Sequence, residues 1–320
     1  MARTSVIIPA YNSAASVGVA IESALAQTRA PLEVIVVDDG STDDTAQVIA
    51  AFGERVVHLT QANAGQGAAR NKGLGVARGE FVALLDADDY WQPAFIERME
   101  DFLDAHPQAV AASCAFKAER KQGDYFGPAH HAQLKAAHPR GLMLDNFYEF
   151  WADHDHVRTG TVLFRRRVID AIGVQNPDLR ISQDLEYWAM IATQGPWGLV
   201  PEVLWVGTSD RLARQYGWRK RYAARRKKAP SIPAWERRVV PLLAPEHRAG
   251  FARVRGRVAA GLMSAHALGG SRVMAQELLE NYGQDMPRGT TWRVLSAANR
   301  FGAPGWALAM AALRLIDRLK

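Results

Sequence analysis

Short apolar runs alternate with helix-like segments through the first part of the chain, and no other feature limits its possible folds as strongly. The apolar runs occupy residues 5–8, 33–37, 56–59 and 81–85. Polar residues do not alternate within them, which is typical of strands buried on both faces. Strands that alternate with helices predict an α/β fold, with a mainly parallel, Rossmann-like sheet flanked by helices.

The same patterns predict the elements that follow. Pro9 should end the first strand. Residues 117–140 are rich in Gly, His, Lys and Pro without a regular period, which predicts a long loop. Residues 211–320 are predicted to form a helical, basic extension. We expect helices at residues 13–27, 43–52, 66–77, 93–105, 165–172 and 182–193, and further strands at residues 110–116, 159–164 and 203–206.

Length and cysteine content limit the class of protein. The 320 residues suffice for one large domain, or for one domain with an appendage. Cys114 is the single cysteine, so an internal disulfide is impossible, which fits a reducing cytoplasm. The apolar stretch at the N-terminus is too short for a signal peptide, and no apolar run is long enough to span a bilayer. We therefore expect a cytoplasmic protein.

Three carboxylates crowd the end of the fourth apolar run, in Asp86-Ala87-Asp88-Asp89. Repulsion and desolvation make this arrangement costly unless a positive charge lies beside it. Mg²⁺ and Mn²⁺ take oxygen ligands, and typically share them between carboxylates, water and substrate phosphates. Taken alone, such a cluster is more often a solvated acidic turn that caps the next helix.

The expected sheet gives this cluster neighbours. In parallel sheets, ligands bind beyond the carboxyl ends of the strands. That rule places residues 9–12, 38–41 and 86–89 along one edge, where their polar groups converge on one crevice. A ligand site at this edge is therefore favoured over an isolated acidic turn.

Two further segments at this edge leave alternatives open. Asp39 could accept a hydrogen bond from the N–H of a bound base, but the surrounding Asp, Gly, Ser and Thr also favour a turn and a helix N-cap. Gly65 and Gly67 open a helix whose amides could approach a phosphate, with Arg70 one turn further on. An ordinary helix start explains the glycines equally well.

Four motifs together resemble one known family. SVIIPAYN at residues 5–12, VVDDGSTD at 36–43, GAARN at 67–71 and LLDADD at 84–89 follow the order found in family 2 glycosyltransferases. The resemblance covers residues 3–210 and implies the GT-A fold and a nucleotide-diphospho-sugar donor. It implies a catalytic domain at 1–210, with a donor-binding half at 1–116 and an acceptor-binding half at 117–210.

The resemblance implies roles for the nucleotide-binding residues. Pro9, Ala10 and Tyr11 resemble the turn that cradles the base, on which Tyr11 would stack. Asp39 resembles the carboxylate that reads the base. Arg70 resembles the arginine that faces the base or the diphosphate.

The acidic cluster and the later motifs resemble the metal site and the catalytic base. Asp86 would lie near the ribose or the metal, with Ala87 in the nucleotide-sugar site. Asp88 would bind Mn²⁺ or Mg²⁺, supported by Asp89. Asp184 resembles the general base, although the chain has Gln183 where many members have Glu. The segments expected to line the donor sugar or the acceptor contribute Thr159, Gly160, Thr161, Gln183 and Glu186.

Other features of the family are weaker in this chain. Residues 215–219 only distantly resemble the motif of processive synthases, and membrane spans are absent, so a non-processive enzyme is expected. A histidine that some relatives supply to the metal is not found near residues 207–210. Five histidines lie close together in the sequence and allow two interpretations, a zinc site or a role that faces the acceptor or solvent, of which the second is favoured. They are His130, His131, His138, His154 and His156. Sugar stacking or simple core packing could explain Trp151, Trp188 and Trp197.

The basic extension suggests an interaction surface. Basic residues are dense at 219–228, and residues 303–320 form an apolar helical pattern. Together they predict peripheral docking on an anionic inner membrane, while packing on the domain itself or a homodimer contact is the competing prediction. A solvated helix face would explain the basic cluster equally well.

The sequence thus predicts a metal-dependent inverting glycosyltransferase that uses a UDP-sugar by default. Its acceptor would be a hydroxyl of a saccharide or lipid-linked molecule, in the synthesis of a cell-surface polysaccharide or glycolipid. Alternatives are a nucleotidyltransferase, which lacks its glycine- and lysine-rich motif here, and a nucleic-acid-binding protein that acts through residues 211–257. Nucleic acid is not expected as a partner.

Overall fold

The computed structural model describes residues 2–121, 124–154, 156–179, 182–208 and 232–318. The basic cluster at 219–228 and the segment 215–219 lie outside the described residues. The chain divides into two compact units, one formed by Met1–Phe147 with His154–Leu212 and the other by Tyr148–Asp153 with Ala213–Lys320.

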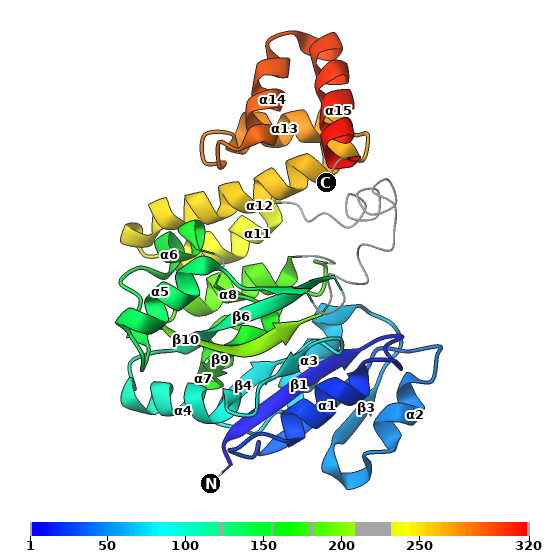
Figure 1. The fold of residues 1–320 in the computed structure, drawn as a ribbon, viewed down its shortest axis with the longest axis vertical. Coiled ribbons are helices and arrows are strands. Elements are labelled where there is room, and N and C mark those ends of the chain that lie inside the picture. Colours follow the sequence, from blue (N-terminus) through cyan, green and yellow to red (C-terminus); the bar gives the residue numbers. More distant parts are fainter. Residues whose placement is uncertain (1, 122–123, 155, 180–181, 209–231, 319–320) are drawn as a thin grey trace. The chain divides into compact units, whose positions relative to one another are not determined.

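A mixed sheet forms the centre of the first unit (Figure 1). Its first four strands, in the spatial order β3, β2, β1, β4, are parallel, whereas β9 runs antiparallel to both β4 and β6. β10 lies parallel to β6 and antiparallel to the short β5. The strands are β1 (Thr4–Ala10), β2 (Glu33–Asp38), β3 (Val57–Thr60), β4 (Phe81–Leu84), β5 (Tyr90–Trp91), β6 (Ala111–Lys121), β9 (Val162–Arg165) and β10 (Trp197–Gly207).

Helices cover both faces of this sheet, as the unbroken apolar strands predicted. Val6 and Ile8 of β1 pack in one core with α1 (Val17–Leu25) and α4 (Phe95–Ala105). Ile7 points to the other face, where α3 (Gln66–Val76) packs so closely that a Cβ on Gly73 would lie 2.5 Å from it. The remaining helices of this unit are α2 (Thr45–Ala50), α5 (Ala129–Ala137), α7 (Arg167–Ile172), α8 (Gln183–Ala192) and the 3-10 turns η1 (Gly53–Arg55) and η2 (Thr159–Thr161).

The predicted loop at 117–140 is wrong. β6 continues to Lys121, β7 (Asp124–Phe126) pairs with it, and α5 follows. The helix is stabilised by a contact that local sequence does not reveal. His131 is buried against the Phe116 ring, and its Nδ1 accepts a hydrogen bond from the Phe116 N–H at 3.4 Å.

Three predicted strand boundaries also differ. β1 runs through Pro9 to Ala10, because its pairing with β4 ends at Ile7 and the missing proline N–H falls beyond that ladder. Residues 159–161 form η2 rather than strand. β10 begins at Trp197 instead of 203, and register shifts against β6 after Val200 and Val203 explain why its pattern is irregular. β8 (Leu142–Met143) pairs with the start of β10.

The second unit is helical, as predicted for its described part. α12 (Arg248–Leu268) packs along α13 (Arg272–Tyr282), and α14 (Thr290–Asn299) forms a hairpin with α15 (Gly302–Arg318). Arg255 of α12 is paired with Glu236 and Asp285. The unit also contains α11 (Ile232–Val239), η3 (Val240–Leu242), η4 (Pro245–His247) and all of α6 (Phe147–Asp153) except its first residue. Among the described residues, every helix is too short or too polar to cross a membrane.

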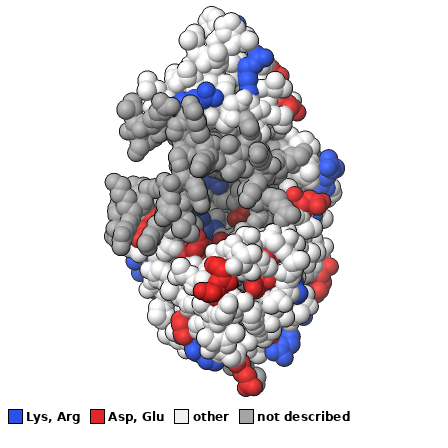
Figure 2. Space-filling model, turned by 90° about the vertical axis from the view of Figure 1, so that its right-hand side faces the viewer, with Lys and Arg blue, Asp and Glu red and all other residues white. Residues whose placement is uncertain are grey.

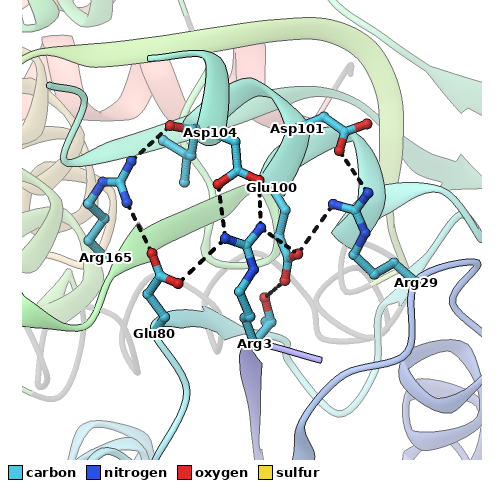
Figure 3. A network of polar contacts seen from close by, with 9 residues as sticks. Arg3, Arg29, Glu80, Glu100, Asp101, Asp104 and Arg165 are labelled. Atoms are coloured by element: carbon cyan, nitrogen blue, oxygen red, sulfur yellow. Dashed lines mark hydrogen bonds and ion pairs between the residues drawn. The ribbon is translucent and has the colours of Figure 1, made fainter. Parts of the chain in front are cut away.

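A network of ion pairs ties α4 to the start of β1 (Figure 3). Glu100 is fully buried, and its carboxylate accepts hydrogen bonds from the Thr4 hydroxyl at 2.6 Å and the Arg3 guanidinium at 3.2 Å. Arg29 reaches the same carboxylate at 3.3 Å and also pairs with Asp101 at 2.8 Å. The Arg3 guanidinium lowers the pKa of Asp104. These charges compensate one another at the amino-terminal end of the sheet.

We expect Glu100→Gln to lower the free energy of unfolding by about 1–3 kcal/mol, because charge-assisted bonds to a buried carboxylate are lost. Asp101→Asn, on the same helix and paired with the same arginine but half exposed, should cost about 0.5 kcal/mol or less. Urea denaturation of both variants at neutral pH measures the difference. Equal losses would show that burial of Glu100 adds nothing.

Candidate active site

The carboxyl ends of β1, β2 and β4 bring three of the predicted motifs to one edge of the sheet. Tyr11 follows β1, Asp39 follows β2, and Asp86 comes two residues after β4. The parallel register sets Ala10 beside Asp38, so the first two loops begin level with each other. Figure 2 looks onto this side of the molecule and shows acidic side chains gathered on it.

The loops after β1 and β2 are joined by Asn12. Its N–H donates to the Ser41 hydroxyl at 3.0 Å, and its side-chain oxygen accepts from the Thr42 N–H at 2.8 Å. Asn12 adopts the left-handed region at φ 49°, which asparagine tolerates. Pro9 and Ala10 are buried within β1, whereas Tyr11 is 48% exposed. Of these three predicted base-binding residues, Tyr11 is therefore the one with an exposed side chain.

Asp39 holds the loop that enters α3. Its buried carboxylate accepts from Gln61 Nε2 at 2.7 Å and from the N–H groups of Ala64 and Gly65 at 2.9 and 2.8 Å. Gly40 next to it has φ 73°, and a Cβ there would lie 2.8 Å from the Asn63 nitrogen. Sequence reasoning missed this contact because two of the three donors are backbone amides.

Arg70 connects α3 to the acidic turn. The side chain is 1% exposed, and its Nη2 donates to Asp86 Oδ1 at 2.6 Å and to the Thr159 hydroxyl at 3.3 Å. Gln66, one turn earlier, donates to the same Asp86 oxygen at 2.8 Å. Nε and Nη1 of Arg70 are buried without a hydrogen-bond partner among the described residues. The guanidinium is thus anchored on Asp86 and retains donors for a further group.

The same contacts continue to Asp184. The Thr159 hydroxyl lies 3.4 Å from Asp184 Oδ2, and Gln183 donates from Nε2 to Gln66 Oε1 at 3.1 Å. Gln183 directly precedes Asp184 at the start of α8, and Gln66 contacts both Gln183 and Asp86. The start of α8 is therefore connected to Asp86 by two routes, one through Thr159 and Arg70 and the other through Gln66. The structure thus brings Asp184 into one network with Asp86. Gln66, which sequence reasoning did not single out, lies inside the glycine-rich motif that it did.

The other two carboxylates of the cluster have different surroundings. Burial, followed by the charge of Asp86, raises the pKa of Asp88 to about 6. Asp89 is buried, and its Oδ1 accepts from the Thr208 N–H at 2.7 Å. The Thr208 hydroxyl donates to the Asp88 carbonyl oxygen. Asp89 thereby fastens the acidic turn to the end of β10.

The donor set fits a divalent cation. Burial is the larger cause of the raised pKa of Asp88 and the charge of Asp86 is the second, and a bound cation would offset both by stabilising the ionised carboxylates. Groups of three or more His, Cys, Asp or Glu side chains suited to a metal do not occur among the described residues. Two carboxylates with water and phosphate oxygens are a usual Mg²⁺ or Mn²⁺ environment. Asp86 and Asp88 are the residues here that would hold such an ion.

Several predicted lining residues have structural partners. The Gly160 carbonyl accepts from Trp91 Nε1 at 2.6 Å, and a Cβ on Gly160 would lie 2.1 Å from Trp205 Nε1. Thr161, Glu186 and Ala87 are buried. Thr159, Gln183 and Asp184 are the predicted residues of this later part that join the network with Asp86.

The histidines and tryptophans contribute to packing. His130 lies with its ring 4.5 Å from His131 and 4.6 Å from His154, but the described residues contain no histidine cluster suited to a metal. The core prediction is confirmed for Trp151, Trp188 and Trp197, all of which are buried. The prediction that no histidine near residues 207–210 binds the metal falls partly on residues 209–210, which lie outside the described residues.

Comparison with known sequences identifies the family. Residues 5–173 match the sequence model of Glycosyl transferase family 2, which covers more than half of the chain. The chain belongs to this family. The resemblance seen in the four motifs is thereby confirmed.

Individual relatives match shorter stretches. The chain is 40% identical over 185 residues to the uncharacterized glycosyltransferase RP339 of Rickettsia prowazekii, which is 58% of this chain and 57% of that protein. It is 32% identical over 204 residues to the succinoglycan biosynthesis protein ExoU of Rhizobium meliloti, which is 59% and 57% of the two chains. Each of these relatives is thus matched over less than three fifths of its length.

Solved structures share the fold. TarS of S. aureus superposes with a TM-score of 0.60 over 97% of this chain and 55% of its own, at 18% identity. TarS 1–349 in complex with UDP-GlcNAc gives 0.54 over 90% and 93% of the two chains, also at 18% identity. The predicted GT-A fold is confirmed by these matches together with the family.

Asp88→Asn should stabilise the protein at alkaline pH. The pKa of Asp88 is about 6 in the fold and about 4 in an unfolded chain. Between these values the folded state binds more protons, so the free energy of unfolding falls as pH rises from about 4 to 6. In EDTA we expect the variant to exceed wild type by about 1–3 kcal/mol at pH 8 and to match it at pH 4, measured by urea denaturation.

Asp89→Asn is the matched control, since it alters a neighbouring carboxylate that accepts a backbone hydrogen bond. It should not stabilise the protein at pH 8. Equal stability of wild type and Asp88→Asn at both pH values would contradict the electrostatic explanation.

Proposed function

We propose that the chain transfers a sugar from a nucleotide-diphospho-sugar, with UDP as the default nucleotide, to a hydroxyl of a saccharide or lipid-linked acceptor. The observation that carries the proposal is the single network that joins Asp86 to Asp184 through Arg70 and Thr159. Glycosyl transfer needs a group that binds the departing diphosphate beside a group that accepts a proton. The network supports the proposal that the diphosphate-binding group and the proton acceptor belong to one site.

The donor would bind at the ends of β1, β2 and β4. Tyr11, exposed beside the loops after β1 and β2, would stack on the base. Asp39 would read the base while it holds the loop into α3. The buried Arg70 has donors left for a base or diphosphate oxygen. Asp88 and Asp86 would hold Mn²⁺ or Mg²⁺, which as a Lewis acid stabilises the charge of the leaving diphosphate.

Asp184 would accept the proton of the attacking hydroxyl. The Thr159 hydroxyl can donate to Asp184 Oδ2, a contact that orients the carboxylate of the proposed general base. Attack by the acceptor opposite the departing diphosphate is one in-line displacement, so the anomeric configuration would invert.

The names of related proteins support a role in surface polysaccharide or glycolipid synthesis. ExoU and ExoO of Rhizobium meliloti are named for succinoglycan biosynthesis, and the ExoO match is 45% identical over 107 residues, 33% of this chain and 31% of that one. TarS 1–349 has been solved with UDP and with UDP-GlcNAc. These names make UDP-sugars the first donors to test.

Asp184→Asn should lower transfer by about 10²- to 10⁴-fold, because general-base catalysis contributes that much. A thermal-shift screen of sugar nucleotides with Mn²⁺ first identifies the donor, which raises Tm by binding the folded state. Transfer to an acceptor is then measured with that donor. The variant should still bind the donor, because the proposed contact of Asp184 is with the acceptor hydroxyl.

Turnover of Asp184→Asn close to wild type would contradict the assignment of the base. A nucleic-acid-binding protein acting through residues 211–257 would instead bind oligonucleotides with steep salt dependence and tolerate Asp88→Ala. A nucleotidyltransferase would release pyrophosphate rather than a nucleoside diphosphate.

We further propose that the α14–α15 hairpin docks on an anionic membrane surface. Trp306, Ala309, Met310 and Leu313 form the buried face of α15, so part of this helix packs on its own unit. Leu308 and Leu315 on its other face are exposed by 74% and 59%, and Phe301, directly before the helix, is exposed by 72%; the three residues are spaced by seven positions. Residues 290–318 contain four arginines and one aspartate, a charge that complements anionic headgroups.

Leu308→Asp should weaken binding to phosphatidylglycerol-containing vesicles by about tenfold, since one buried leucine contributes about 1.5–3 kcal/mol. Flotation measures the bound fraction, and raised salt should reduce it. Val19→Asp, an equally simple change at an exposed residue of α1, is the control. The membrane proposal would be wrong if wild type did not bind vesicles. If wild type then sedimented as a dimer and Leu308→Asp as a monomer, the exposed face would instead bind a second copy of the chain.

A further inference from the structure

Asn71 of α3 holds the backbone of a segment far away in the sequence. Its Nδ2 donates to the Gln175 carbonyl oxygen at 2.7 Å, and its Oδ1 accepts from the Gln175 N–H at 2.9 Å. One side chain thus satisfies both backbone hydrogen-bonding groups of a residue 104 positions away. A buried backbone group without a partner is costly, so the pair is a firm attachment point.

The attached segment leads to the start of α8. Gln175 is fully buried, and a Cβ on Gly67 would lie 3.6 Å from the Asn176 carbonyl oxygen and 3.5 Å from Gln183 Cγ. The first turn of α3 therefore packs directly on residues that precede Asp184. The hydrogen bond from Gln183 to Gln66 at 3.1 Å is a second attachment to the same helix.

The start of α8 depends on such external support. Ser182, its N-cap, adopts the left-handed region at φ 61° and makes no side-chain capping hydrogen bond. Non-glycine residues in that region are strained by about 1 kcal/mol or more and persist where neighbouring structure holds them. Asp184 is two residues further on, so its position follows from how this start is held.

We infer that Asn71 is a positioning residue for Asp184. The inference rests on the proposed role of Asp184 as the base. Arg70 and Asn71 are consecutive on α3, and Arg70 holds Asp86 while Asn71 holds the segment before Asp184. One rigid helix therefore sets the spacing between the diphosphate-binding turn and the proton acceptor. Asn71 touches neither Asp86 nor Asp184 in any hydrogen bond among the described residues.

Asn71→Ala should lower kcat by about 10- to 100-fold with little change in donor affinity, because a misplacement near 1 Å of a reacting group can cost about that much. The matched control is Lys72→Ala. Lys72 is the next residue of α3, and its exposed side chain donates a hydrogen bond to the Thr60 carbonyl oxygen. The control variant therefore also removes a hydrogen bond from a side chain of α3 to a carbonyl. It should keep kcat within about twofold.

A double-mutant cycle separates positioning from general damage. If Asn71 acts through Asp184, adding Asn71→Ala to Asp184→Asn should cost no more than about twofold further. Additive losses in the cycle, or an unchanged kcat in Asn71→Ala, would overturn the inference. Donor affinity, measured by titration with UDP and Mn²⁺, should agree between wild type and Asn71→Ala.

Hydrogen exchange keeps the inference testable even if no donor is found. In the full chain, Asn71→Ala should increase amide exchange of the peptides that contain Gln175 and the start of α8, while Lys72→Ala leaves them protected. Unchanged protection in Asn71→Ala would overturn the inference. If wild type transferred no sugar but Asn71→Ala still lost this protection, the proposed function would be refuted. The conclusion that Asn71 holds the segment before α8 would still stand.

Discussion

The ion pair between Arg70 and Asp86 is the interaction on which the rest of the site depends. A guanidinium that is almost inaccessible to water is stable only beside a compensating charge, and Asp86 Oδ1 lies 2.6 Å from it. The pair fixes α3 against the turn after β4. Because Thr159 and Gln183 also contact α3 residues, the later half of the unit is aligned with the same helix.

Charged side chains are compensated at one end of the sheet and only partly compensated at the other. At the amino-terminal end, Glu100 is buried among Arg3, Arg29 and the Thr4 hydroxyl, and the charges there compensate one another (Figure 3). At the carboxyl end, burial and then the charge of Asp86 raise the pKa of Asp88 to about 6. Uncompensated charge is typical of binding sites, where it costs stability in the unliganded protein and favours a charged ligand.

Local sequence predicted some of this well and some badly. The acidic cluster was placed correctly after a buried strand, because the apolar run of β4 and its position in the sheet are local properties. The loop predicted at 117–140 was wrong, because α5 depends on packing of His131 against Phe116 rather than on its own periodicity. The loop-holding contacts of Asp39 were not predictable, since Ala64 and Gly65 take part through their amides.

The sequence by itself determined the family, the parallel order of motifs and the edge of the sheet where they meet. Hydrophobic period and motif spacing are written along the chain, and parallel strands necessarily end at a common edge. Only the tertiary structure decided which side chains meet there. The pairing of Asn71 with Gln175, 104 residues apart, depends on how antiparallel β9 and the segment after it return to α3, a long-range packing outcome that no local pattern encodes.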